Sequence, residues 1–539
     1  MKVLLINPFM LTEPEFSLSR IEHCTADIEE PIGLQSIAAY MRKHMPSIDI
    51  DVYDANAYAF AEISKKGVVD MPQLYAMVKE KISYSAPDIV GVSAMFEFCG
   101  PESHKITKIT KECNPDIVTV MGGAYASFSY IKALADSSLD FIIKGEGEKA
   151  FLLLIEYLLG IRSIGEVESL IFRSSDSKIS SNPQGSLLSA EDIPTPLRDE
   201  RLRDLYAKNN KRSIRRFLGE AYDAKVASVV ATRGCRYQCA FCSTKELWGR
   251  SFRPRAIASV IQEIRNLQEL FGVNTIIFND DAISLDSKWF ISFLKELQKL
   301  NIRWFGGPQP THTTQEIIRL CIESGIVLFG INPESGSNET LKKIRKPLNT
   351  QMTERFIEMV KSVDKDIYIY ASWVVGFPFE NMAQIRQTYE FAESLDIDWS
   401  AFYCFTPYPG TELYDQCIDQ GLIDSNHKVS NVLSFNAINT SSFSSEELLT
   451  ANYYQNLNLN FLNNRNREKN PDRYVRDMLD MTLNYPNHVF AYYCLSCYYN
   501  DSFDHIKGEE YLAKARQAAK NDLFYKPFIY QYNLQNILL

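Results

Sequence analysis

The chain lacks several features that would point to familiar functions. No apolar run in its 539 residues comes near the roughly 20 that a membrane-spanning helix needs. The apolar start ends at Asn7 and Pro8, too early for the core of a signal peptide, and no cleavage site of small residues follows. Positive charge is scarce, with 57 Lys and Arg against 67 Asp and Glu, for a net charge of −10. We therefore expect a cytoplasmic protein without a membrane span or a nucleic-acid partner.

Two further patterns are absent or weak. No Gly-x-Gly-x-x-Gly follows the first predicted strand, which argues against a dinucleotide site of the Rossmann type. One local basic stretch, residues 208–216, stands out against the acidic average. Short charged runs usually form solvated surface, so we interpret this stretch as part of a linker and not as a binding site.

Cysteine is the residue whose distribution carries chemistry. The chain has 11 cysteines scattered over its length, which fits a reducing compartment better than a disulfide framework. Three of them, Cys235, Cys239 and Cys242, stand in a Cys-x3-Cys-x2-Cys pattern. A structural zinc site would need a fourth ligand, and the next candidates, His312 and Cys321, lie about seventy residues downstream. Thiolates also ligate iron–sulfur clusters, and three of them leave one iron of a cubane open to another ligand.

This spacing, with Phe241 just before the last cysteine, resembles the signature of the radical S-adenosylmethionine (SAM) superfamily. The resemblance implies a 4Fe–4S cluster on the three cysteines and SAM chelated to the open iron through its amino and carboxylate groups. It also implies a 5′-deoxyadenosyl radical, formed with an electron from a flavodoxin or a ferredoxin.

Residues 1–173 are predicted to form a Rossmann-like domain. Buried strands alternate with helices, which implies right-handed crossovers, a parallel sheet and a ligand beyond the carboxyl ends of the strands. The expected strands are 3–6, 48–53, 88–93, 117–121 and a closing strand 141–143, with helices from Pro31 and over 71–83.

Small and polar residues follow these strands, so a wide, flat ligand could approach the backbone closely. With the segment that begins at Pro31, they resemble the cobalamin-binding domain found ahead of many radical SAM modules. The residues that this resemblance assigns to cobalamin are Asn7, Pro8, Ser93, Ala94, Met95, Gly122, Gly123, Ala124, Tyr125, Gly145, Glu146 and Gly147. The Asp-x-His-x-x-Gly motif that supplies a lower cobalt ligand in many B12 proteins is missing, so no histidine lower ligand is expected. The alternative is a Rossmann-like domain that has lost its ligand.

Residues 174–225 are predicted to be a linker, since they are rich in Ser, Asn and Gly with little periodicity. Residues 226–425 are predicted to form six β/α units, too few for a closed eight-stranded barrel. The expected architecture is a laterally open, partial barrel with its site on the loops after the strands. The expected strands lie at or near 226–231, 274–279, 302–305, 326–331, 367–375 and 401–405, and a helix from Pro254 ends at Gly272.

The loops after the later strands also resemble radical SAM motifs. The residues that the resemblance assigns to SAM are Phe241, Asp280, Asp281, Glu334, Ser335, Val375, Gly376 and Tyr403. Carboxylates there would bind the methionine or ribose part, and the backbone near Gly376 would pair with adenine. The alternative is that Asp280, Asp281, Glu334 and Glu380 are ordinary caps at helix N-termini. No catalytic residue can be assigned; His312 is a candidate proton acceptor, although a lone histidine is more often packed or capping.

Residues 426–539 are predicted to form a helical domain that covers the active site, with a capping box at Ser444 and a helix over 506–520. Cys494 and Cys497 stand three apart and could help to bind a second cluster. No further pair stands nearby, so we interpret them as core residues.

Over about residues 1–425, the resemblance implies a cobalamin-dependent radical SAM enzyme that methylates an unactivated carbon of a small molecule or peptide. An aliphatic C–H offers no nucleophile for polar methyl transfer, so the methyl would pass through methylcobalamin to a carbon radical. Cyclisation, ring contraction or oxidation without methyl transfer stays open, as does a non-catalytic corrinoid protein. A tRNA methylthiotransferase would need a second cysteine set and a basic tail, and Cys24, Cys99 and Cys113 do not follow strand ends in that way.

Overall fold

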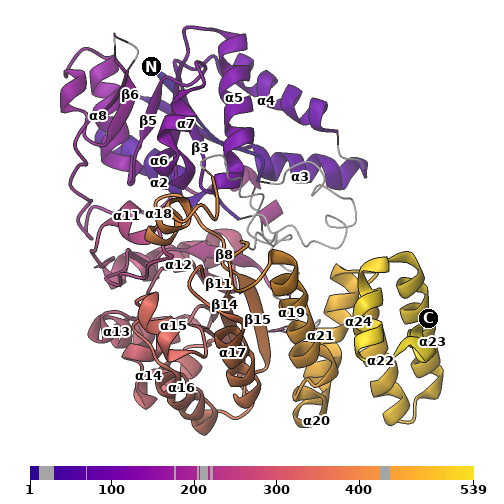
Figure 1. Ribbon diagram of the computed structural model, residues 1–539. Helices are drawn as coiled ribbons and strands as arrows, with labels where there is room; N and C mark the ends of the chain where they lie inside the picture. The colour runs from indigo at the N-terminus through magenta and orange to yellow at the C-terminus, as the bar shows by residue number, and fades with distance from the viewer. Residues whose placement is uncertain are drawn as a thin grey trace.

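The computed structural model describes residues 1–10, 29–67, 70–174, 176, 178–202, 205–206, 217–218, 223–424 and 438–539. The basic stretch 208–216 and Cys24 lie outside these residues. Two α/β bodies are stacked on one another, and a group of C-terminal helices lies beside the second (Figure 1). Among the described helices, none has the length and apolar character that crossing a bilayer requires.

The first body is built on a seven-stranded sheet with the order β2-β1-β3-β4-β5-β6-β7. Its first five strands are parallel, as predicted, and the last two add an antiparallel edge. The strands are β1 (Lys2–Asn7), β2 (Asp49–Asp54), β3 (Ile89–Ser93), β4 (Val118–Gly122), β5 (Phe141–Ile143), β6 (Leu170–Arg173) and β7 (Ile179–Ser181). The prediction that the sheet closes at 141–143 is therefore wrong, and β7 lies in the stretch predicted to be linker.

Helices cover both faces of this sheet and give it two cores. On one face α2 (Ile32–His44) packs beside α8 (Gly147–Leu158), and α2 begins directly after Pro31, as predicted. The other face carries α3 (Ala55–Lys66), α4 (Met71–Ser85) and α5 (Gly100–Cys113). Helix α3 was not predicted; it begins at Asp54, whose side chain caps the first turn by accepting from the Ala57 amide. The short elements of this body are η1 (Glu97–Cys99), α6 (Ala124–Phe128), α7 (Tyr130–Leu134) and η2 (Ile164–Glu166).

The second body is the predicted partial barrel. A three-stranded sheet β12-β11-β8 and another, β13-β14-β15, are both parallel and are joined by a bridge between Trp304 and Ile326. The strands are β8 (Val226–Val229), β11 (Thr275–Phe278), β12 (Arg303–Phe305), β13 (Leu328–Glu334), β14 (Tyr368–Val375) and β15 (Trp399–Cys404). The helices are α11 (Thr244–Trp248), α12 (Ile257–Phe271), α13 (Ser287–Leu297), α14 (Gln315–Glu323), α15 (Asn338–Lys343), α16 (Thr350–Val363), α17 (Met382–Ser394) and α18 (Glu412–Asp419).

One helix boundary in the barrel differs from the prediction. Pro254 does not start α12; it lies in the short strand β10 (Arg253–Pro254), which pairs with β9 (Thr232–Arg233) just ahead of the cysteines. The helix begins three residues later and ends at Gly272, which takes the left-handed conformation that suits glycine at a helix end.

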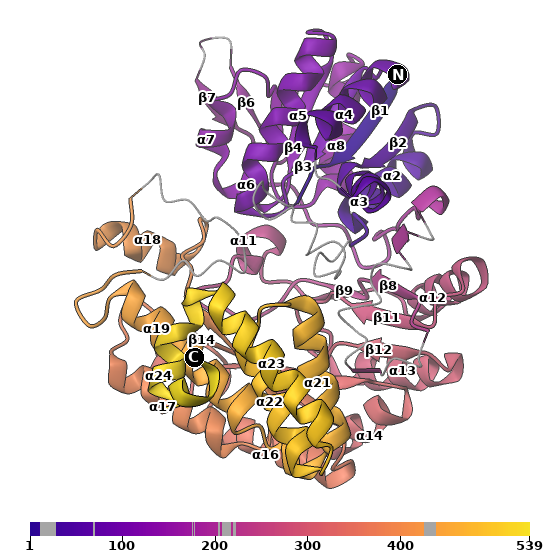
Figure 2. The same ribbon diagram turned by 90° about the vertical axis from the view of Figure 1, so that its right-hand side faces the viewer.

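The C-terminal helices lie at one side of the barrel, next to its edge strand β15 (Figure 1 and Figure 2). They are α19 (Ser445–Leu457), α20 (Asn466–Lys469), α21 (Pro471–Asn484), α22 (Val489–Asp501), α23 (His505–Asn521), α24 (Lys526–Gln531) and α25 (Gln535–Leu538). The predicted capping box at Ser444 is present. Their core, which includes buried Cys494, packs on Leu328, Tyr368 and Trp399 at the starts of the last three strands. The later helices therefore pack on the strand starts, whereas α19 lies against Gly376 and Cys404 at the carboxyl ends of β14 and β15.

Candidate functional site

A cavity of about 700 Å³ lies between the two bodies, a volume typical of cofactor sites. It is bounded on one side by loops at the carboxyl ends of β1, β3 and β4, and on the other by the segment that follows the first barrel strand. Its lining includes Asn7, Ser93, Met95, Ala124 and Tyr125 from the first body and Thr232, Thr244, Trp248 and Asp281 from the second. Met95 and the neighbouring Phe96 are 46% and 39% exposed, so this wall presents apolar side chains to the cavity.

Other residues predicted to contact cobalamin do not line this cavity: Pro8, Ala94, Gly122, Gly123, Gly145, Glu146 and Gly147. For two of these positions, packing inside the protein explains why the residue is glycine. A β-carbon on Gly123 would overlap the carbonyl group of Ala94, and one on Gly147 would lie 2.6 Å from Cδ1 of Ile37. Both glycines allow close packing within the protein itself.

Glu146 takes part in a contact between the two bodies. Its carboxylate lies 2.7 Å from Arg253 and 3.2 Å from Arg233, while Glu148 lies 2.6 Å from Arg233. Burial alone would raise the pKa of Glu146, but the hydrogen bond from Arg253 and the charge of Arg233 hold it below its ordinary value. Glu146 is thus engaged in ion pairs, and its role at the cofactor stays a prediction. Since Arg233 lies two residues before Cys235, this contact fixes the loop that carries the three cysteines, the cysteine loop, against the first body.

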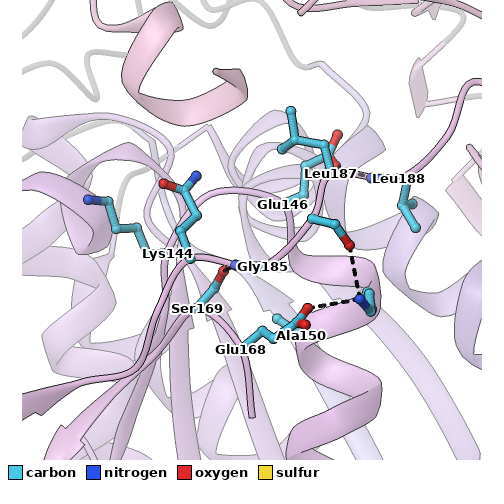
Figure 3. A pocket seen from close by; sticks show the side chains of 11 residues that line it. Lys144, Glu146, Ala150, Glu168, Ser169, Gly185, Leu187 and Leu188 are labelled. Atoms are coloured by element: carbon cyan, nitrogen blue, oxygen red, sulfur yellow. Dashed lines mark hydrogen bonds and ion pairs between the residues drawn. The ribbon is translucent and has the colours of Figure 1, made fainter. Parts of the chain in front are cut away.

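Behind Glu146 lies a second, much smaller cavity of about 20 Å³ (Figure 3). The Leu188 amide donates to the Glu146 carboxylate at 2.9 Å, and Lys149 bridges Glu168 and Ser186. This volume has room for little more than one water molecule, so it is not a cofactor site.

Asn7, at the end of β1, is held by a buried carboxylate. Its side-chain amide donates to Asp54 at 2.9 Å, and the Tyr206 hydroxyl donates to the other Asp54 oxygen at 2.6 Å. Burial raises the pKa of Asp54 to about 6, although these hydrogen bonds oppose the rise. Tyr206 lies in the predicted linker, where sequence periodicity gave no sign of this role.

The two adjacent aspartates after β11 serve different purposes. Asp280 accepts from the Thr232 hydroxyl at 2.6 Å and from the Ala231 amide at 3.2 Å, and burial raises its pKa to about 7. It therefore fixes the start of the cysteine loop, and its carboxylate is not aimed into the cavity. Asp281 lines the cavity and accepts from the Thr244 hydroxyl at 3.3 Å. Of the pair, Asp281 remains the candidate for SAM.

The three cysteines lie half-buried on the loop after β9. Burial raises the pKa of Cys239 to about 11, and the pKa of Cys235 also lies above its ordinary value, chiefly through burial. Within the described residues, no three His, Cys, Asp or Glu side chains converge to hold a single metal ion. A cubane has four irons, each with its own ligand, so its cysteines need not converge on one point. Three thiols on one loop are thus a donor set that fits a cluster with one open iron.

Glu334 ends β13 in an unusual conformation. Its φ is +67°, next to an irregularity in the pairing of β13 with β14, and its carboxylate lies 2.7 Å from the ammonium of Lys346. Sequence reasoning missed Lys346, because a lysine that follows a helix is ordinarily solvated.

Ser335, next to Glu334, and the predicted SAM loop after β14 are held by internal bonds. Ser335 is buried and lies 3.0 Å from Thr388, which turns it toward α17. Glu380 is 1% exposed and accepts from the Gly376 and Phe377 amides at 2.8 and 3.0 Å. Burial raises the pKa of Glu380 to about 7. Glu380 therefore closes its own loop, and the Gly376 amide is already engaged.

The remaining predicted residues lie around the barrel mouth. Phe241 packs on Phe377 at 5.8 Å between ring centres, and the fully buried Val375 belongs to the barrel core. The Tyr403 hydroxyl lies 3.4 Å from that of Tyr370. His312 stacks on Tyr237 of the cysteine loop at 6.1 Å, outside the lining of the large cavity. Its role as a proton acceptor stays a prediction.

Comparison with known families matches the two bodies separately. The Radical SAM superfamily matches residues 229–392, which hold the three cysteines and most of the barrel. The B12 binding domain matches residues 21–155, which hold most of the first sheet.

Relatives with similar sequences span most of the chain. Cytidylyl-2-hydroxyethylphosphonate methyltransferase of Streptomyces wedmorensis is 26% identical over 462 residues, 78% of this chain and 83% of its own. An uncharacterized methyltransferase of Pyrococcus horikoshii is 27% identical over 435 residues, 78% of this chain and 84% of its own. Anaerobic magnesium-protoporphyrin IX monomethyl ester cyclase of Rubrivivax gelatinosus is 28% identical over 355 residues, 64% of this chain and 60% of its own.

Solved structures share the fold of nearly the whole chain. The cobalamin-dependent SAM radical enzyme OxsB, with aqua-cobalamin and SAM bound, has a TM-score of 0.62 at 15% identity over 99% of this chain and 75% of its own. TsrM from Kitasatospora setae, with cobalamin and a 4Fe–4S cluster bound, has a TM-score of 0.60 at 16% identity over 96% and 99%. A B12-binding region stands ahead of a radical SAM region that carries the cysteine loop. The chain therefore belongs to the radical SAM enzymes with an N-terminal B12-binding domain.

Proposed function

We propose that the chain is a cobalamin-dependent radical SAM methyltransferase that methylates an unactivated carbon of a small molecule or a peptide. The observation that carries this proposal is the cavity of about 700 Å³. The strand ends of the B12-binding body and the loop that bears the cysteines both line this cavity. Methyl transfer to a carbon radical needs both cofactors and the substrate at reacting distance, with water excluded.

The roles of this chain's residues follow from their places. Cys235, Cys239 and Cys242 would hold the cluster, and Asp281 would bind the methionine end of SAM. Met95 would lie against the corrinoid, since an exposed apolar wall gains most when a ligand covers it. When bound, the three cofactors supply electron transfer, hydrogen abstraction and methyl transfer. A flavodoxin or a ferredoxin would supply the electron.

The relatives support methylation as the outcome. Two of those that span most of the chain are named methyltransferases, and TsrM was solved with a tryptophan substrate. Two cyclase matches keep a second candidate open, a cyclisation without methyl transfer, but they cover 64% and 68% of this chain. Both candidates use the same cofactors and differ in the product.

A methylthiotransferase fits less well. Ribosomal protein uS12 methylthiotransferase RimO of Synechococcus elongatus matches over 199 residues, 35% of this chain. Cys99 and Cys113 stand at opposite ends of α5, so a helix of 14 residues holds them roughly 20 Å apart. They cannot share one cluster in this arrangement.

The test begins with cofactor content. The protein is purified anaerobically with hydroxocobalamin, the cluster is reconstituted, and iron and corrinoid are quantified per chain. About four irons and one corrinoid are expected. Incubation with methyl-labelled SAM and candidate substrates then separates methylation from cyclisation by the label in the product. Four irons without corrinoid would refute the cobalamin mechanism.

A cavity-filling variant makes this test specific. A β-carbon on Gly33 would meet no atom within 4 Å, and this residue lies in the first turn of α2 at the cavity wall. Gly33→Phe should therefore keep the fold and the four irons but lose the corrinoid, because the ring occupies its space. Gly165→Phe is the matched control, since Gly165 is equally unobstructed and lies outside the cavity. Corrinoid retention by Gly33→Phe would place the cofactor elsewhere.

A further inference from the structure

The turn that follows α15 holds a lysine, Lys346, against the cysteine loop. Lys346 has an 18% exposed side chain, whereas its neighbours Lys343 and Arg345 are 44% and 42% exposed. Its ammonium contacts the 9% exposed carboxylate of Glu334 at 2.7 Å. Lysine is rarely withdrawn from water to this extent without a role for its charge.

Three contacts fix the turn to the cysteine loop. The Ala240 amide donates to the Ile344 carbonyl at 2.9 Å, and Nε of Arg345 donates to the Gln238 carbonyl at 2.9 Å. The Cys239 sulfur lies 3.9 Å from the Arg345 carbonyl oxygen. Arg345 has a φ of +56°, so the backbone turns sharply just before Lys346. Cys239 and Lys346 are therefore neighbours across a contact with a defined shape.

The closeness of Lys346 to the cysteine loop places a positive charge beside the predicted cluster ligands. The turn holds the Lys346 ammonium beside the cysteine loop with an 18% exposed side chain, so water screens its charge less than that of Lys343 or Arg345. A cubane bound by three thiolates carries negative charge, and reduction adds one electron more. Glu334 neutralises part of the lysine charge, while Asp281 adds a negative charge near Cys235.

We propose that Lys346 is the counter-ion of the cluster, a fixed ammonium that stabilises the reduced state and so raises the reduction potential. Net charge is one of the levers by which proteins set the potential of such clusters. Lys346 contacts neither substrate nor reacting atoms in this role, so it is a positioning residue. The inference rests on the proposed function only in requiring that the cysteines carry a cluster.

The test compares three variants of the full chain after anaerobic reconstitution. Lys346→Met removes the charge and keeps the apolar stem, Lys346→Arg keeps the charge, and Lys343→Met removes a solvated charge from the same segment. Iron is counted, and the cluster is titrated electrochemically with detection by electron paramagnetic resonance. At a fixed potential, the ratio of reduced to oxidised cluster should fall roughly tenfold in Lys346→Met, as expected for one partly screened charge. Lys346→Arg and Lys343→Met should match the wild type.

Each outcome decides the question. Loss of iron in Lys346→Met, together with wild-type iron in Lys346→Arg, would also support the counter-ion role. Arginine keeps the positive charge and methionine does not. A midpoint potential in Lys346→Met equal to that of the wild type would overturn the proposal. An equal loss of iron in Lys346→Arg would overturn it too. These results leave the proposed function intact. If the wild type itself takes up no cluster, the proposed function fails and the inference fails with it.

Discussion

Replacing Gly123 by alanine should destabilise the protein strongly. Gly123 has a φ of +101° and a ψ of −179°, a backbone conformation that is essentially reserved for glycine. A β-carbon there would overlap the carbonyl oxygen of Ala94 and lie 2.6 Å from the carbonyl carbon. The backbone strain costs about 1–3 kcal/mol, and forcing apart the loops after β3 and β4 adds a further penalty of about 1–3 kcal/mol. We therefore expect a loss of about 2–6 kcal/mol in the free energy of unfolding.

The neighbouring glycine is the control for this prediction. A β-carbon on Gly122 would come no closer than 3.8 Å to another atom, the carbonyl oxygen of Ile143, and its φ is not positive. Gly122→Ala should therefore change the free energy of unfolding by less than about 1 kcal/mol. Urea unfolding followed by far-ultraviolet circular dichroism measures both variants. Equal stability of the two variants would refute the reasoning, since it would mean that Ala94 does not constrain Gly123.

Two more predictions concern buried charge. The folded pKa of Glu380 is about 7 against an ordinary 4.5, so its favourable contribution is full below pH 4.5 and is lost as the pH rises toward 7. Glu380→Gln should therefore gain up to about 3 kcal/mol over the wild type between pH 4.5 and 8 in urea unfolding, and parallel pH profiles would contradict this. Arg233→Met leaves Glu148 buried without its cation and should cost about 3–5 kcal/mol. The exposed Arg201→Met should cost under about 1 kcal/mol, and similar melting temperatures for these two variants would refute the difference.

The elements with strong periodicity or long apolar runs could be predicted from the sequence. The five parallel strands of the first body and the six of the barrel lie within a few residues of their expected bounds. The edge strands β6 and β7 could not, because they are four and three residues long. Their conformation depends on pairing with β5 and with one another, which local composition does not encode.

Side-chain direction was the other quantity that local sequence could not supply. Asp280 and Asp281 are identical in type, yet one holds Thr232 and the other faces the cavity. Glu146 stands in a motif that suggested the cofactor, but its partners Arg233 and Arg253 lie 87 and 107 residues further along the chain. The cysteine spacing was informative because the whole donor set lies on one loop.

The ion pairs between Glu146, Glu148, Arg233 and Arg253 bear on how such enzymes can be recombined. A chimera that exchanges the B12-binding region for that of a relative would cut the chain in the linker between the two bodies. The acidic half of this contact would then be replaced while the basic half stayed beside the cysteines. Such a graft should assemble only if the incoming region brings its own two carboxylates at the start of the helix after β5. A chimera should therefore be designed so that both sides of these ion pairs match, because a boundary in the linker alone separates them.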